Sequence, residues 1–129
     1  MENSEAQTAP AAIIIDDHRA LAESLAERLA IEGFHTTVAT TVAEGLAASS
    51  RQSYDVAFVD LNLPDASGIA AAEELKKRSK DLRVILVTGL AASVDDAEPG
   101  WSHIDGVLPK PWKPAELEAI LHTLGRANR

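Results

Sequence analysis

Short apolar runs alternate with longer stretches of helical periodicity along the chain. Runs rich in aliphatic residues lie at 11–15, 56–59, 82–87 and 104–108, and residues 34–39 form a further plausible strand. Apolar runs of this length are typical of strands buried on both faces of a parallel sheet. The pattern therefore predicts five strands, most of them buried.

Between these runs, apolar residues recur at helical spacing. Leucines at 21, 25 and 29 share one helix face, and Gly33 is expected to end that helix. Thr41 and Glu44 have the spacing of a capping box at the start of the second helix. Further helices are expected over 69–78, in a short form over 91–98, and from Pro114 with a buried stripe of Leu117, Ile120, Leu121 and Leu124.

Strands that alternate with helices form a parallel sheet covered on both faces. We therefore predict one α/β domain with a doubly wound, five-stranded parallel sheet in the flavodoxin-like order 2-1-3-4-5 and helices on both faces. Residues 1–10 are polar and acidic and predict a flexible tail, which leaves 11–129 for the folded domain.

Composition narrows the class of function. The 129 residues contain no cysteine, which excludes disulfides and thiolate chemistry and suits a cytoplasmic location. No apolar run approaches the length of a membrane span, so no membrane partner is expected. A formal net charge of −8 argues against direct binding of nucleic acid and favours a basic protein partner or a bound cation.

Polar residues follow the predicted strands where each strand ends. Asp16 and Asp17 follow the first strand, Asp60 the third, Thr88 the fourth and Lys110 the fifth. Carboxyl ends of parallel strands meet at one edge, where ligands bind. Clustered carboxylates require a cation, Mg²⁺ above all, and a hydroxyl and an ammonium suit phosphoryl oxygens. Asp60 would be the nucleophile that forms an acyl phosphate.

Each of these residues also has a purely structural interpretation. Asp16 and Asp17 can be helix caps, Thr88 a strand-end hydroxyl and Lys110 a solvated charge. The joint arrangement in chain order favours the functional interpretation. His18 is interpreted as a partly exposed residue at the helix start, because no second histidine lies at ligand spacing.

With these residues in place, the chain resembles the receiver domains of two-component response regulators. The resemblance implies that Asp16 and Asp17 help to hold Mg²⁺ or Mn²⁺ and that Asp60 is both phosphoacceptor and metal ligand. In Asp-Leu-Asn-Leu-Pro-Asp-Ala-Ser-Gly, it implies a metal-binding backbone carbonyl at Asn62. It also implies a switch hydroxyl at Thr88, a phosphate-binding Lys110, and a cis peptide between Lys110 and Pro111.

The chain departs from this family in the switch region. Receivers commonly carry Tyr or Phe three residues before the lysine, and Val107 occupies that position. Because valine has no ring to rotate, we expect the segment 89–100 to carry any switch instead. Hydrogen exchange with and without beryllofluoride tests this, and protection changes that spare 89–103 would contradict it.

The resemblance implies a receiver that accepts a phosphoryl group from a sensor histidine kinase or histidine phosphotransfer protein. It would signal to a downstream protein effector and catalyse only its own phosphorylation and dephosphorylation. A pseudo-receiver, which binds partners independently of phosphate, is the alternative. An aspartate-nucleophile phosphatase would need a second Asp at the position that Asn62 occupies. A dinucleotide enzyme would need a Gly-x-Gly-x-x-Gly motif after the first strand, and this chain has none there.

Overall fold

The computed structural model describes residues 9–89 and 101–127. Most of the expected tail and the whole of the expected helix at 91–98 lie outside these residues. The strands are β1 (Ala11–Ile15), β2 (His35–Ala39), β3 (Val56–Asp60), β4 (Arg83–Thr88) and β5 (Gly106–Pro109). The helices are α1 (Arg19–Ile31), α2 (Val42–Arg51), α3 (Gly68–Arg78), the 3₁₀ turn η2 (Trp101–His103) and α4 (Pro114–Ala127).

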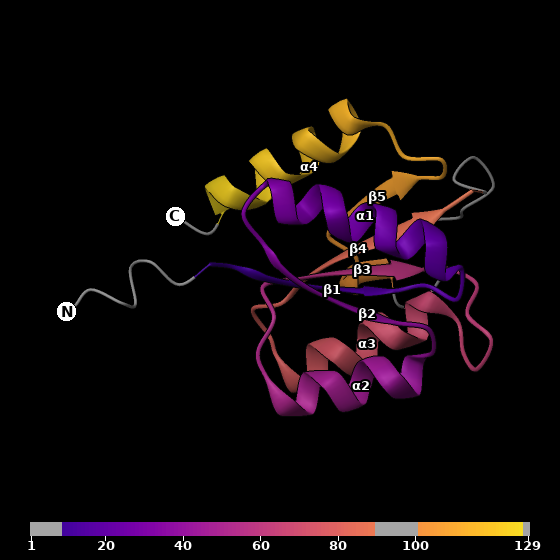
Figure 1. The fold of residues 1–129 in the computed structure, drawn as a ribbon. Coiled ribbons are helices and arrows are strands. Elements are labelled where there is room, and N and C mark those ends of the chain that lie inside the picture. Colours follow the sequence, from indigo (N-terminus) through magenta and orange to yellow (C-terminus); the bar gives the residue numbers. More distant parts are fainter. Residues whose placement is uncertain (1–8, 90–100, 128–129) are drawn as a thin grey trace.

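All five strands are parallel and lie in the order β2-β1-β3-β4-β5, as predicted. Helices α1 and α4 cover one face of the sheet, and α2 and α3 cover the other (Figure 1). The predicted fold class is therefore confirmed. Within the described residues, no helix combines the length and apolar character needed to cross a membrane.

The core is divided by the sheet into two layers. Alternate strand residues such as Ile14 and Phe58 pack towards α1 and α4, whereas Ile13 and Val59 pack towards α2 and α3. Side chains of a strand alternate between faces, so a strand covered on both faces must be apolar throughout. This requirement explains the continuous apolar runs of β1, β3 and β4.

The ends of α1 and α2 follow from local chemistry. Gly33 has a φ of 104°, which a glycine adopts without steric cost, and it closes α1 as expected. At α2, Thr41 Oγ1 accepts a hydrogen bond from the Glu44 amide over 3.1 Å. Only this half of the predicted capping box forms between the pair, because the Glu44 carboxylate accepts from the amide and hydroxyl of Thr40 instead.

The fifth strand begins two residues later than the sequence predicts. The Asp105 carboxylate accepts the Val84 N–H over 2.8 Å, in the place that a strand partner would take. The same carboxylate forms an ion pair with Lys76 Nζ at 2.8 Å, and both side chains are largely buried. Lys76 joins α3 to the start of β5.

Candidate functional site

The register of the sheet brings the predicted site residues to one edge. Ile15 pairs with Val59, so the next residues along, Asp16 and Asp60, leave neighbouring strands side by side. Asp60 itself is the last residue of β3 and is 5% exposed, while Asp16 is 4% exposed. Two carboxylates are thus held at the end of an apolar strand pair, where water screens their charges poorly.

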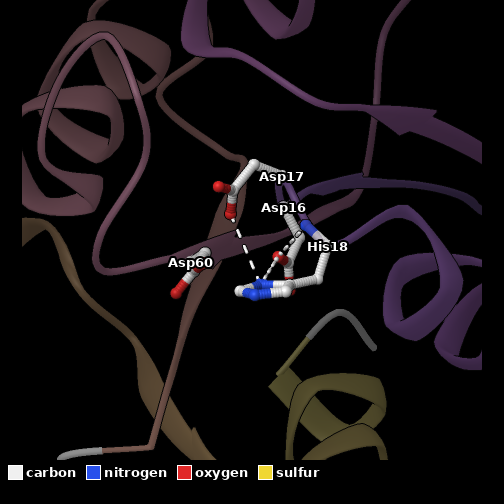
Figure 2. A group of neighbouring side chains, drawn as sticks. All are labelled: Asp16, Asp17, His18 and Asp60. Carbon is white, nitrogen blue, oxygen red and sulfur yellow. Dashed lines mark hydrogen bonds and ion pairs between the residues drawn. The ribbon is translucent and has the colours of Figure 1, made fainter.

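Asp17 and His18 complete a cluster with these two acids. One ligand atom from each of the four side chains lies within 4.8 Å of the others (Figure 2). His18 precedes α1 and its side chain is 66% exposed, as expected for a residue at the helix start. Its Nδ1 nevertheless lies 3.4 Å from Asp16 Oδ1 and 3.5 Å from Asp17 Oδ1. The sequence interpretation did not anticipate this contact.

Lys110 lies against the two buried carboxylates. Its Nζ is 3.0 Å from Asp16 Oδ2 and 3.4 Å from Asp60 Oδ2. The β4–β5 pairing positions it, because Pro109 pairs with Thr88 and the Lys110 amide donates to the Thr88 carbonyl over 2.9 Å. The lysine is therefore attached through backbone to the strand that carries Thr88.

Burial raises the pKa of Asp60, and the neighbouring Asp16 carboxylate raises it further. The Lys110 ammonium and the Asn62 amide oppose this rise in pKa. Three carboxylates against this one ammonium leave the group two charges negative, so a divalent cation would balance it. Carboxylate oxygens are the donors that Mg²⁺ and Mn²⁺ prefer, and Asp16, Asp17 and Asp60 fit such an ion.

Thr88 and Asn62 border this group. Thr88 is the last residue of β4, one residue beyond Val87, the pairing partner of Asp60, and is 1% exposed. The Asn62 amide donates to Asp60 Oδ1 over 3.4 Å, which places the Asn62 backbone against the acid. The sheet edge thus brings together every residue that the sequence analysis assigned to the site, while their roles stay predictions.

The loop between β3 and α3, residues 61–67, is closed at its base. The Gly68 amide donates to the Leu61 carbonyl over 2.7 Å, and Asn62 and Ser67 form an antiparallel bridge. Gly68 is needed here because a Cβ at this position would lie 2.3 Å from the Asp60 carbonyl oxygen. The first turn of α3 therefore packs directly on the end of the strand that carries the candidate nucleophile.

An apolar groove of about 550 Å³ opens beside the charged group. Its lining is Asp16, Leu21, Ser24, Leu25, Val87, Lys110, Pro111, Trp112 and Pro114. The Lys110–Pro111 peptide is cis, as the resemblance implied, and Trp112 is half-buried against the α1/α4 core. Sequence patterns did not reveal the groove, because it forms between α1 and a loop ninety residues later.

Two further histidines of the described residues lie outside this cluster. His35 begins β2 and His103 ends η2, and neither belongs to the acidic cluster. Val107, in the position where the family commonly has an aromatic ring, is 37% exposed. Most of the segment proposed as a switch, residues 90–100, lies outside the described part of the chain.

Comparison with known proteins agrees with the fold. A sequence profile of the response regulator receiver domain matches residues 12–122. The chain is 32% identical over 120 residues to the transcriptional activator protein PfeR of Pseudomonas aeruginosa, covering 93% of this chain and 39% of PfeR. It is 33% identical over 119 residues to the transcriptional regulatory protein TctD of Salmonella typhimurium, covering 90% of this chain and 52% of TctD. The chain thus spans about half or less of the length of these relatives.

Solved structures give the same result. A CheY-like receiver domain from Methylobacillus flagellatus superposes with a TM-score of 0.82 at 32% identity, over 91% of this chain and 99% of that one. The response regulator TrrA of Thermotoga maritima, in complex with Mg²⁺ and BeF, superposes with a TM-score of 0.80 at 26% identity, over 89% and 98%. The chain therefore belongs to the receiver domain family of two-component response regulators.

Proposed function

We propose that this receiver accepts a phosphoryl group on Asp60 from the phosphohistidine of a sensor kinase or histidine phosphotransfer protein. One observation carries the proposal: the Asp60 carboxylate lies at the sheet edge with the Lys110 ammonium at 3.4 Å and two further acids around it. Nucleophile, counter-charge and cation donors are thus present at one point. The similarity to TrrA, which was solved with Mg²⁺ and BeF, supports the same assignment.

In the proposed reaction, an Asp60 oxygen attacks phosphorus as the phosphorus–nitrogen bond to the donor imidazole breaks. The electron pair of the broken bond stays on the imidazole nitrogen, the ring leaves neutral because its other nitrogen carries a proton, and an acyl phosphate remains on Asp60. The Lys110 ammonium and the Thr88 hydroxyl bind phosphoryl oxygens, which stabilises charge that develops during transfer. Asp16, Asp17, Asp60 and the Asn62 carbonyl would hold a Mg²⁺ or Mn²⁺ ion, which would supply further charge neutralisation.

Release completes the cycle. Water attacks phosphorus, the acyl oxygen of Asp60 leaves, and inorganic phosphate departs. The domain would thus catalyse only its own phosphorylation and dephosphorylation, and its signal would pass to a downstream protein effector. We propose that the domain works in the cytoplasm and has no direct nucleic acid or membrane partner. Its formal net charge of −8 disfavours contact with the phosphates of nucleic acids.

The donor protein would dock at the apolar groove. Leu21 is 46% exposed, lines the groove next to Leu25, and lies on α1 beside the acidic cluster. A groove that ends at Asp16 and Lys110 leads from an apolar contact surface to the reacting group. Apolar side chains beside the acidic cluster would bind the partner protein and hold it while its histidine reaches Asp60.

Uptake of phosphate from acetyl phosphate with Mg²⁺ tests the function. Intact-protein mass spectrometry should show one added phosphoryl group on the wild type and none on Asp60→Asn. Asp81→Asn, which changes an exposed aspartate in the turn before β4, is the matched control and should be phosphorylated normally. If the wild type takes up no phosphate from acetyl phosphate or from any phosphorylated kinase, the proposal fails and the pseudo-receiver interpretation replaces it.

A further inference from the structure

The loop of residues 61–67 is joined to the start of α2 by one aspartate. Asp65 Oδ1 accepts the Val42 N–H over 3.0 Å, and Oδ2 accepts the Ala43 N–H over 3.1 Å. These are the first two residues of α2, whose amides have no acceptor within the helix. The hydroxyl of Thr41, the local cap, accepts from the Glu44 amide. The cap of α2 is thus shared between a neighbour and a residue 22 to 23 positions away.

The contact between the Asp65 carboxylate and the start of α2 depends on charge as well as on hydrogen bonds. The hydrogen bond from the Val42 amide lowers the pKa of Asp65, the Ala43 amide adds to this effect, and partial desolvation opposes it. The carboxylate is therefore ionised at neutral pH and faces the positive end of the α2 dipole. A charge-assisted bidentate contact of this kind restrains the direction of the side chain and of the loop that carries it.

Asp65 lies three residues from Asn62 in the same short loop. The loop base is closed by the Asn62–Ser67 bridge, and the side chains of Leu63 and Ala66 are half-buried against the α2/α3 core. The Asp65 contact connects the tip of the loop to α2, on the side away from that base. Movement of the tip would pass to Asn62 through only two intervening residues.

We propose that Asp65 is a positioning residue for the phosphoacceptor site: by fixing the 61–67 loop to α2, it holds the Asn62 backbone beside Asp60. This inference rests on the proposed function, since Asn62 is there given the role of metal ligand through its carbonyl. A loop held in place before the ion arrives loses less conformational entropy when the ion binds. Without the Asp65 contact, the loop would become ordered only when the metal binds, and the entropy lost in that ordering would lower the affinity for the metal.

Asp65→Ala and Thr41→Ala form a matched pair. Each removes capping from the first turn of α2, and only the first releases the loop. Asp65→Asn is a third variant that keeps one acceptor oxygen and loses the charge. Two quantities are measured on all three and on the wild type: amide hydrogen exchange of residues 42–44 and 62–68, and the Kd for Mg²⁺ by calorimetry.

We expect Asp65→Ala to speed exchange at residues 62 and 68 and to raise the Mg²⁺ Kd by about threefold to tenfold. This is below the range for residues that bond directly to metal ligands, because Asp65 acts through backbone. Thr41→Ala should speed exchange at Glu44 and leave the loop and the Kd unchanged. The loop exchange rates and the Mg²⁺ Kd of Asp65→Asn should lie between those of the wild type and Asp65→Ala.

Equal loop exchange in Asp65→Ala and wild type would overturn the proposal, whether or not Mg²⁺ binds. A Kd that rises equally in Asp65→Ala and Thr41→Ala would also overturn it, because Asp65 would then be a helix cap alone. If the wild type binds no Mg²⁺, the metal assignment of the proposed function fails, and the exchange data still show whether Asp65 holds the loop.

Discussion

Replacement of Asp60 by Asn should make the metal-free domain more stable. Asp60 is nearly buried, and burial and Asp16 raise its pKa, so its ionised form is disfavoured in the folded state. An acid whose pKa is higher in the folded than in the unfolded state loses stability as the pH rises from the unfolded to the folded pKa. Above both pKa values the whole of this penalty is present, and Asn removes it.

The size of this stability gain depends on the charges around Asp60 and on the burial of its carboxylate. Asp16 and Asp17 each offer an oxygen within 4.8 Å of Asp60, which at an effective dielectric constant of 20 gives repulsions of about 3.5 kcal/mol each. Lys110 Nζ, at 3.4 Å from Asp60 Oδ2, attracts the Asp60 carboxylate by about 5 kcal/mol on the same scale. Because Asp17 is 40% exposed, solvent screens its share, so repulsion and attraction nearly cancel. The gain for Asp60→Asn then comes mainly from the burial of the ionised carboxylate, and we expect about 1–2 kcal/mol.

Thermal unfolding without divalent ions measures this gain. At pH 7, Asp60→Asn should raise Tm by roughly 3–8 °C for a domain of this size. The difference should shrink below the ordinary aspartate pKa of 3.8, where the unfolded acid is also protonated. Exposed Asp81→Asn should change Tm little at either pH. An unchanged or lowered Tm at pH 7, or a gain that persists at low pH, would refute the electrostatic reasoning.

Three further predictions concern neighbouring groups. Lys110→Ala removes a counter-charge from Asp60, so the domain should fold while its beryllofluoride affinity with Mg²⁺ falls roughly tenfold, and unchanged affinity would count against the lysine's role. Leu21→Asp should slow phosphotransfer from a panel of phosphorylated histidine kinases and spare uptake from acetyl phosphate; equal loss from both donors would argue against groove docking. Gly68→Ala forces a Cβ against the Asp60 carbonyl and should cost about 1–3 kcal/mol and weaken Mg²⁺ binding, and a wild-type Tm would show that α3 can shift freely.

Much of the fold and site could be predicted because both depend on local sequence pattern. A strand covered on both faces must be apolar throughout, so β1, β3 and β4 were recognisable. Parallel strands end at one edge, so residues that follow those runs had to meet there. This rule alone predicts that Asp16, Asp60 and Lys110 meet at that edge.

Strand and helix boundaries were less predictable, because side chains compete with backbone for hydrogen bonds. Asp105 takes the Val84 amide and delays the start of β5. Glu44 binds Thr40 and leaves the capping box half formed. Each outcome depends on which acceptor lies nearest in space, and a spacing rule along the chain carries no information about that distance.

The sequence by itself determined the α/β class and the residues at the carboxyl edge of the sheet, since periodicity and strand ends are properties of neighbouring positions. The strand order was predicted from the common topology of doubly wound sheets. Only the tertiary structure decided the contacts between distant segments: Asp65 on the start of α2, Lys76 on Asp105, and the groove between Leu21 and Trp112. These contacts depend on how helices settle on the sheet. Packing of the whole core sets that position, and local propensity does not encode it.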